Sequence, residues 1–248
     1  PSRYCTPKPL SVSAACTVCG ACVPTCKFDA MKVEEEQKAA VASLGDYKGL
    51  WVFAEQRGGV IQDVTFELLG KGRELADELG VELAAVLLGS QMKEKASLLF
   101  EYGADKVYYV DDPGLAEYNT EPYTDVFSDL LNKYKPEAVL VGATSIGRAF
   151  IPRVAVRVKT GLTADCTELA IDTDKRLLLQ TRPAFGGNIM ATIICPDYRP
   201  QMATVRHKVF KKPVPHHGRS GQLVEEKAVI KDSRARIVEV LHEMLNQV

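Results

Sequence analysis

The sequence lacks a long hydrophobic run: no apolar stretch approaches the ~20 residues that a helix needs to cross a bilayer. It also lacks a signal-type segment, charged and then apolar, at its start. Neither sign of charge is in excess, because 31 lysines and arginines stand against 32 aspartates and glutamates, and the formal net charge is −1. Such a chain has no global field that would draw it onto a polyanion. We therefore expect a cytoplasmic protein that binds neither nucleic acid nor membrane.

Cysteine is scarce outside one short segment. Only Cys166 and Cys195 lie elsewhere, and we expect both to be small buried side chains. Four of the others follow the spacing with which bacterial ferredoxins hold an iron–sulfur cluster, Cys16-x-x-Cys19-x-x-Cys22-x-x-x-Cys26. A structural zinc site would usually show two ligand pairs separated by a longer loop. Residues 1–36 are therefore predicted to form a ferredoxin-like segment with a 4Fe-4S cluster.

The fourth ligand of that cluster has two candidates. In two-cluster ferredoxins the last cysteine of such a run serves the other cluster, so Cys26 is not required to complete the site made by the first three. A short repeat offers Cys5 instead, because residues 5–12 align with residues 26–33, cysteine on cysteine. Both alternatives stay open: Cys5 is the fourth ligand, or Cys26 closes its own run.

A linker at 37–48 leads to a domain over 49–232 in which short apolar runs alternate with amphipathic stretches. Strands are predicted at 50–54, 82–88, 106–110 and 138–141, with helices at 63–79, 91–102 and 123–134. This alternation indicates the α/β class, with a doubly wound parallel sheet covered on both faces. Asp63 is expected to cap the first helix and Gly80 to end it, while the interior Gly70 and Gly72 count against a continuous helix.

The remainder of the domain is predicted to be richer in strands. Apolar runs at 177–181, 190–194 and 202–205 follow without long helices between them, and a final helix is expected at 233–246. In parallel sheets of this class, ligands bind at the carboxyl ends of the strands. That rule selects residues 55–57, 89–90 and 142–145 as candidate site segments.

Several motifs resemble the alpha subunit of electron-transfer flavoproteins, over about residues 50–210. They are Val52 to Gly59, the run Gly-Ala-Thr-Ser-Ile-Gly-Arg at 142–148, Arg153 to Ala155 leading into 160–166, and 182–188 together with 199–206. The resemblance implies the first domain of that subunit, whose fold is similar to adenine-nucleotide hydrolases. It also implies a beta-subunit partner and an FAD or AMP held mainly by that partner near the boundary.

The N-terminal cysteine run is similar to the extension found on alpha subunits of electron-bifurcating complexes of anaerobes. That resemblance implies electron transfer between NADH, flavin, ferredoxin and a flavin-dependent dehydrogenase of the acyl-CoA or lactate type, with no catalytic site in this chain itself. Family members continue into an FAD-binding domain, whereas this sequence runs from Pro1 to Val248. We therefore expect that domain, and something upstream of Pro1, to be missing, and residues 233–248 to lead toward the absent domain.

The resemblance and the residue types give two sets of candidate flavin contacts. Arg148 is the first, because a guanidinium can hydrogen-bond a flavin nitrogen, and it is joined by Thr144 and Ser145 at the strand-to-helix turn. The second set combines a cation with an aromatic ring and glycines that permit close backbone approach: Arg182, Phe185, Gly186, Gly187 and Asn188. An ion pair at the surface would explain Arg148 equally, and packing against a beta subunit would explain the second set.

Two other function classes compete with an electron carrier. A lone α/β domain of this type could bind an adenine nucleotide as a sensor, although a sensor has no need of a low-potential cluster. A ferredoxin-fused docking scaffold without flavin chemistry is the other alternative. An absorption spectrum separates the three, because cluster and flavin absorb differently.

Overall fold

The structure is a computed structural model that describes residues 44–230, 233–235 and 237–240. The predicted ferredoxin-like segment, with its five cysteines, lies outside the described residues. The described part forms one body that begins at the short 3-10 helix η1 (Leu44–Asp46). None of its helices combines the length and the apolar character that a membrane crossing requires.

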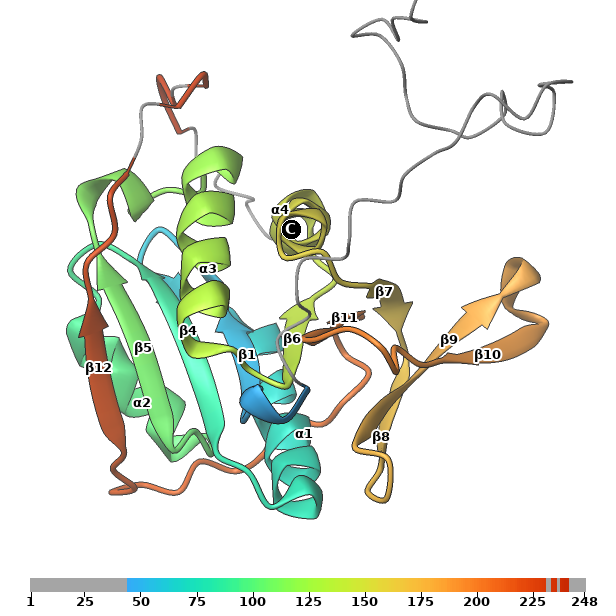
Figure 1. Cartoon of the computed structure of the whole chain (residues 1–248). Coiled ribbons are helices and arrows are strands. Elements are labelled where there is room, and N and C mark those ends of the chain that lie inside the picture. Colours follow the sequence, from blue (N-terminus) through green and yellow to red (C-terminus); the bar gives the residue numbers. More distant parts are fainter. Residues whose placement is uncertain (1–43, 231–232, 236, 241–248) are drawn as a thin grey trace, which may run out of the picture. The chain divides into compact units, whose positions relative to one another are not determined.

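A seven-stranded sheet lies at the centre of the domain (Figure 1). Its strand order is β12-β5-β4-β1-β6-β11-β7, and every neighbouring pair is parallel. The strands are β1 (Leu50–Ala54), β4 (Leu83–Gly89), β5 (Lys106–Asp111), β6 (Ala138–Gly142), β7 (Leu162–Cys166), β11 (Gln201–Val205) and β12 (Gln222–Glu226). The predicted parallel sheet is therefore confirmed.

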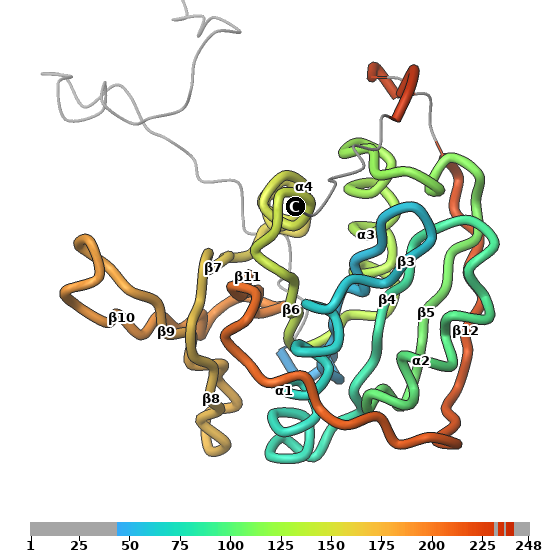
Figure 2. Tube along the Cα trace, turned by 180° about the vertical axis from the view of Figure 1, so that it is seen from behind, coloured from blue at the N-terminus to red at the C-terminus, as the bar shows by residue number. Residues whose placement is uncertain are grey.

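Helices cover both faces of this sheet, as the alternation of strands and helices requires. They are α1 (Asp63–Leu79) and α2 (Ala96–Glu101) on one face, and α3 (Thr120–Tyr134) and α4 (Ser145–Arg157) on the other. The two layers are seen from opposite sides in Figures 1 and 2. Short 3-10 helices lie in the connections: η2 (Lys93–Lys95), η3 (Pro113–Leu115) and η4 (Phe185–Gly187).

Strand β1 shows why the central strands are apolar throughout. Leu50, Val52 and Ala54 pack in the core with α1 and α2, whereas Trp51 and Phe53 pack in the core with α3 and α4. All five residues are buried. Since successive side chains point to opposite faces, a strand covered on both sides has no position left for a polar residue.

Three further strands form an antiparallel arm, which we define as β8 (Glu168–Asp172), β9 (Leu177–Ala184) and β10 (Ile189–Ile193). Figure 1 shows the arm extending from the β7 side of the sheet. A two-residue pair, β2 (Gln56–Arg57) and β3 (Val60–Ile61), forms a small hairpin directly after β1. The predicted β-rich stretches at 177–181, 190–194 and 202–205 thus correspond to β9, β10 and β11.

Some details differ from the sequence-based expectation. Asp63 is not the cap of α1: Gln62 holds that position without a side-chain hydrogen bond, and Asp63 is the first helical residue. Gly70 and Gly72 do not interrupt α1, because Gly72 lies against Leu83, Val52 and Leu50 and lets the helix approach the sheet. Gly80 ends the helix in a left-handed conformation, as predicted.

Two predicted helices are also different. Residues 91–102 were expected to form one helix, but only η2 and the six-residue α2 form there, since residue 91 has a positive φ and Met92 is not helical. The final helix expected at 233–246 does not occur in the described residues 233–235 and 237–240. The remainder of that stretch lies outside the described residues.

Candidate functional site

The carboxyl ends of β1 and β6 lie side by side at the topological switch point of the sheet, where the strand order reverses. After β1 the chain builds β4 and β5 on one side, and after β6 it builds β7 and β11 on the other. Open α/β sheets bind ligands at such a switch point. The structure brings together here the two predicted segments 55–57 and 142–145, and Arg57 Nη2 donates to Ser145 Oγ at 3.2 Å.

Thr144 connects the two strand ends through its hydroxyl. This hydroxyl accepts a hydrogen bond from Gly147 N at 3.1 Å, which caps α4, and donates to the Glu55 carboxylate. The other carboxylate oxygen of Glu55 accepts from Arg57 at 3.1 Å and 3.3 Å. Glu55 is almost fully buried, and a buried carboxylate is tolerated only with such partners. Glu55 therefore fixes the geometry of the turn, and Arg57 presents the exposed charge.

A hollow of about 370 Å³ opens at this end of the sheet, and we call it the switch-point hollow. Its lining carries both signs of charge, since Glu55 and Glu67 contribute carboxylates and Arg57 and Lys208 contribute cations. Glu67 is itself occupied, because it accepts the Lys208 backbone N–H at 2.7 Å. Val64 is the one apolar side chain in the lining. A flavin ring needs planar apolar walls, so this hollow fits the polar edge of such a group and not its ring system.

Arg148 lies in the first turn of α4, as predicted, and its side chain is 56% exposed. Its guanidinium donates from Nε and Nη2 to Asp165 Oδ1 of β7, at 3.1 Å and 2.8 Å. Asp165 has a positive φ, and its backbone N–H donates to Thr204 Oγ1. The surface ion pair considered for Arg148 is therefore present. A more than half-exposed guanidinium keeps donors free for a group that approaches from outside, so its role as a flavin contact stays a prediction.

The second predicted set lies on the arm. Arg182 is on β9, where it pairs with Ala191, and the positive charge of Arg182 acts on the Cys166 thiol next to Asp165. The other four members, Phe185 to Asn188, form the turn between β9 and β10, and Phe185 is 83% exposed. Gly186 and Gly187 have positive φ with open space beside them. Arg182 thus lies near Cys166, next to the Asp165 that pairs with Arg148, whereas the other four residues lie at the tip of the arm.

The arm also carries an exposed apolar surface that the sequence did not indicate. Phe185 is joined by further exposed hydrophobic side chains of β10, namely Ile189, Met190 and Ile193, and the segment directly after β10 exposes Ile194 and Tyr198. Exposed apolar surface of this extent on one projecting element is typical of a surface that another protein covers.

The two isolated cysteines differ from each other. Cys166 is fully buried, as predicted, and desolvation raises the pKa of its thiol to about 11. Cys195 is only half-buried, contrary to the expectation, because its stretch of chain follows the open end of β10. Among the described residues, no group of three or more histidine, cysteine, aspartate or glutamate side chains is placed to hold a metal ion. Cys5, Cys16, Cys19, Cys22 and Cys26 all lie outside those residues.

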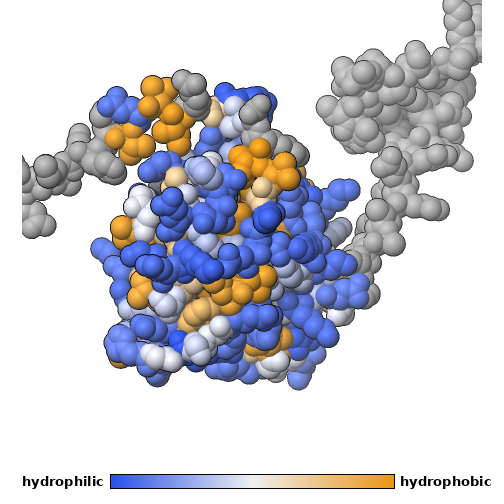
Figure 3. All heavy atoms as spheres, turned by 90° about the vertical axis from the view of Figure 1, so that its left-hand side faces the viewer, coloured by the Kyte–Doolittle hydropathy of each residue, from blue (hydrophilic) through white to orange (hydrophobic). Residues whose placement is uncertain are grey.

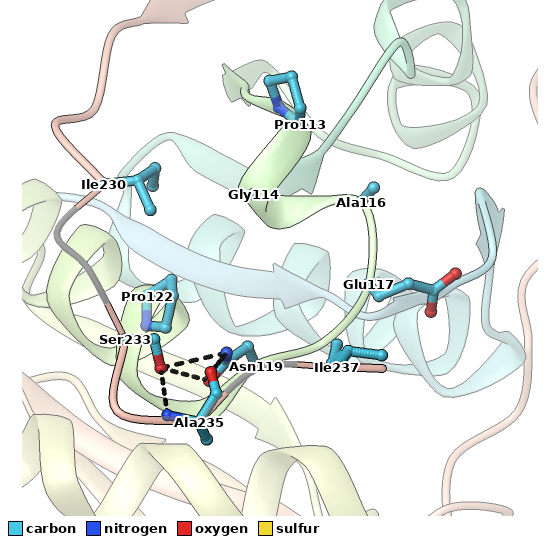
Figure 4. A pocket seen from close by; sticks show the side chains of 10 residues that line it. All are labelled: Pro113, Gly114, Ala116, Glu117, Asn119, Pro122, Ile230, Ser233, Ala235 and Ile237. Atoms are coloured by element: carbon cyan, nitrogen blue, oxygen red, sulfur yellow. Dashed lines mark hydrogen bonds between the residues drawn. The ribbon is translucent and has the colours of Figure 1, made fainter. Parts of the chain in front are cut away.

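A second hollow, of about 520 Å³, lies between the start of α3 and the chain after β12 (Figure 4). Ser233 Oγ and the Ala235 carbonyl accept hydrogen bonds from Asn119 Nδ2 at 3.2 Å and 2.9 Å. Glu121 accepts from the Arg234 backbone N–H and from its guanidinium. These bonds lower the pKa of Glu121 to about 2, chiefly through the Arg234 backbone N–H. None of the predicted site residues lines this hollow. The segment 233–235, which we call the outgoing chain, is hydrogen-bonded here to the start of α3.

The residues that sequence reasoning missed are those whose partners are distant in the chain. Glu55 was named only as part of a strand end, and neither Lys208 nor Glu67 was singled out. The one sequence signal that could have found such residues is the rule that ligands bind at the carboxyl ends of parallel strands. This rule selects positions directly after strands, and it therefore misses helix residues such as Glu67.

Comparison with known proteins supports one assignment. The model of the electron transfer flavoprotein domain matches residues 50–231. The electron transfer flavoprotein subunit alpha of Megasphaera elsdenii is 54% identical over 190 residues, which are 77% of this chain and 56% of that protein.

Two further relatives belong to named enzyme complexes. The LctC subunit of the lactate dehydrogenase (NAD(+),ferredoxin) of Acetobacterium woodii is 48% identical over 207 residues, or 82% of this chain and 48% of that one. The acryloyl-CoA reductase electron transfer subunit beta of Anaerotignum propionicum is 46% identical over 193 residues, or 69% and 53% of the two chains. The chain spans about half the length of these relatives. The match of the family model and the identity to the Megasphaera elsdenii subunit alpha show that the chain belongs to the electron transfer flavoprotein family.

Proposed function

We propose that this chain is part of a cytoplasmic electron-transfer subunit of a flavin-based electron-bifurcating complex. In this role it passes electrons between NADH, flavin, ferredoxin and a partner dehydrogenase of the acyl-CoA or lactate type. The names of two relatives favour these partners, since one serves a lactate dehydrogenase that uses NAD(+) and ferredoxin and another serves an acryloyl-CoA reductase. A beta subunit is the immediate partner.

The observation that carries the proposal is the combination of cations and exposed apolar surface beside β7. Arg148 and Arg182 both lie near the segment of Asp165 and Cys166, and the arm that starts there exposes Phe185. An apolar surface suits a beta subunit, and guanidinium groups suit the electron-rich edge of a flavin. Flavin, when bound, supplies the one- and two-electron chemistry.

The described residues fit a flavin that is shared and not enclosed. The switch-point hollow is polar, with one apolar wall residue, whereas Arg148 on α4 is more than half exposed and open to an approaching group. In this arrangement Arg148 would hold one edge of an FAD bound mainly by the beta subunit. Isolated from its partners, the 248-residue chain should therefore bind no stoichiometric FAD.

Arg148→Ala tests that contact in the complex with the beta subunit. Loss of the cation should lower the potential at which the neighbouring flavin is reduced, because the anionic reduced form loses a stabilising charge. Spectroelectrochemistry measures this. Arg157→Ala is a matched control on the same helix, since Arg157 pairs with Asp125 and its removal should leave the potentials unchanged. Unchanged potentials in a correctly assembled Arg148→Ala complex would assign Arg148 to the surface ion pair alone.

The 4Fe-4S cluster belongs to the same proposal and rests on the spacing of Cys16, Cys19, Cys22 and Cys26. Cys5→Ser should cost the cluster its fourth thiolate if the repeat alignment is correct, and Cys26→Ser should then leave it whole. Electron paramagnetic resonance of anaerobically purified chains distinguishes the two, because a cubane without one thiolate tends to lose an iron. The opposite pattern would assign Cys26.

The whole assignment is tested by an absorption spectrum of the purified chain, alone and with its co-purifying subunits. Cluster absorbance in the chain and additional flavin bands in the complex are expected. Cluster absorbance without flavin in the complex would favour a docking scaffold. Neither signal, together with binding of an adenine nucleotide, would favour a sensor.

A further inference from the structure

The only tryptophan of the chain is the innermost ring of a group of three aromatic side chains that extends from the core toward the surface. Trp51 on β1 is 3% exposed, and its ring centroid is 4.6 Å from that of Tyr108 on β5. The Tyr108 ring is in turn 4.4 Å from that of Tyr134, the last residue of α3. Trp51 and Tyr134 are 6.0 Å apart. The three rings thus form one continuous contact from the core outward.

Within the part of the chain that the structure describes, the outermost ring is the only one of the three whose polar group has a hydrogen-bond acceptor. The Tyr134 hydroxyl donates a short hydrogen bond to Glu226 Oε1 at the end of β12. Glu226 is held by Lys133, whose ammonium donates to both carboxylate oxygens at 2.9 Å and 2.8 Å, and these bonds lower the pKa of Glu226. Glu226 is therefore a carboxylate at neutral pH, and because its Oε1 already accepts the phenol hydrogen, it lies in place to receive the proton.

The middle ring differs in this respect. The Tyr108 hydroxyl makes no hydrogen bond among the described residues, and desolvation, followed by the charges of Tyr134, Glu82 and Glu226, raises its pKa to about 12. A tyrosine radical is stable only when its proton leaves, because the phenol radical cation is a very strong acid. Tyr108 can therefore conduct an electron without holding the radical, whereas Tyr134 can hold it.

We propose that Trp51, Tyr108 and Tyr134 form a relay that moves an oxidising equivalent from the core to the surface, with Glu226 as the proton acceptor. The oxidant is a one-electron oxidant of the oxygen-radical class, which removes an electron from the buried indole. One electron then passes from Tyr134 through Tyr108 to the indole radical cation. The O–H bond of Tyr134 breaks, and its proton moves to Glu226.

The products of this step balance. They are neutral Trp51, a neutral Tyr134 phenoxyl radical and a protonated Glu226, so that a positive and a negative charge have cancelled. Lys133 is more than half exposed and can be solvated once Glu226 is neutral. A dissolved thiol then returns a hydrogen atom to Tyr134, and Glu226 releases its proton to water. This activity is independent of the electron-transfer role proposed above, and it protects the packed core from covalent oxidation.

The sole tryptophan makes the relay measurable in the full chain. A laser pulse that photoionises Trp51, with the ejected electron scavenged, should give the tryptophan radical absorbance, which converts into the tyrosine radical absorbance. Tyr134→Phe keeps the aromatic ring but removes the hydroxyl group whose proton must leave, so the conversion of the tryptophan radical into the tyrosine radical should be lost. Glu226→Gln should slow it by ~100-fold, the lower range of what a positioned proton acceptor contributes.

Tyr102→Phe is the matched control. Tyr102 stacks on Phe66 at 4.2 Å in the core on the other face of the sheet, so its loss should leave the conversion unchanged. Thermal unfolding verifies that each variant is folded. A tyrosine radical of equal yield in Tyr134→Phe, or a tryptophan radical that persists in the unsubstituted chain, would overturn the relay. An unchanged rate in Glu226→Gln would overturn the role of Glu226.

Discussion

Gly147 lies in the first turn of α4, and its replacement by alanine provides the sharpest test of how that helix meets the sheet. A Cβ built at this position would be 1.9 Å from the carbonyl oxygen of Gly142, the last residue of β6. Contacts of a Cβ below 3.0 Å essentially do not occur. The carbonyl oxygen belongs to the backbone and the position of a Cβ is fixed by the backbone, so no side-chain rotation relieves the contact, and either α4 or the end of β6 must move.

The expected sign is the reverse of the usual one. In an ordinary helix interior, alanine is more favourable than glycine by ~1 kcal/mol. Here the shift of α4 would also break the Thr144 cap, worth ~1 kcal/mol, and overpacking adds ~1–3 kcal/mol or more. The gain and the loss of the cap cancel, and because a 1.9 Å approach is severe the overpacking cost lies in the upper half of its range, so we expect Gly147→Ala to lower the free energy of unfolding by ~2–3 kcal/mol.

Urea unfolding followed by the fluorescence of Trp51 measures this change. With a slope of ~2 kcal/mol per M, the midpoint should fall by ~1–2 M. Gly72→Ala is the control, because its Cβ would meet only side-chain ends, those of Leu83, Val52 and Leu50 at 3.0 to 3.3 Å. Its effect should remain within ~1 kcal/mol. A Gly147→Ala chain as stable as the unsubstituted one would refute the reasoning.

Two further predictions concern titratable groups. Burial raises the pKa of the Cys166 thiol to about 11, so iodoacetamide at pH 8 should label Cys166 far more slowly than the half-buried Cys195. Peptide mass spectrometry measures the two labelling rates, and equal rates would contradict this prediction. Glu121→Gln should loosen the outgoing chain, so that trypsin cleaves after Arg234 several-fold faster at neutral pH. Since the folded pKa of Glu121 is depressed, its attachment is complete above the usual value of 4.5 and is lost as the pH falls toward 2. An attachment already lost at pH 4.5 would contradict that shift.

The sequence predicts best what depends on local pattern and on general rules of sheets. The apolar run 50–54 is β1 because both of its faces are buried, and the strand ends at Glu55 and Thr144 meet because parallel strands end at one edge. The helix predicted at 91–102 is shorter than expected: it begins as a 3-10 turn at Lys93 and continues as α2, because the positive φ at Gln91 delays its start, which no periodicity reveals.

Distant partners are the part that the sequence could not supply. The ion pair of Arg148 depends on Asp165, which lies 17 residues further along the chain, on β7, and has a positive φ that no pattern in the sequence indicates. The apolar side chains of the arm follow the pattern of any strand, and only the structure shows that none of the helices α1 to α4 covers them. Figure 3 shows the β12 side of the molecule, opposite the arm, where separate hydrophobic patches lie within a mainly hydrophilic surface.

The position of β12 affects how the protein folds during its synthesis. Leu223 of β12 pairs with Val107 of β5, so more than one hundred residues separate two neighbouring strands. At ~5–20 residues per second, a ribosome needs ~6–20 s to make that stretch. For this time the outer edge of β5 has no strand beside it, and a bare edge is a template for pairing with other chains. The nascent domain should therefore depend on chaperones until residue 226 has left the ribosome.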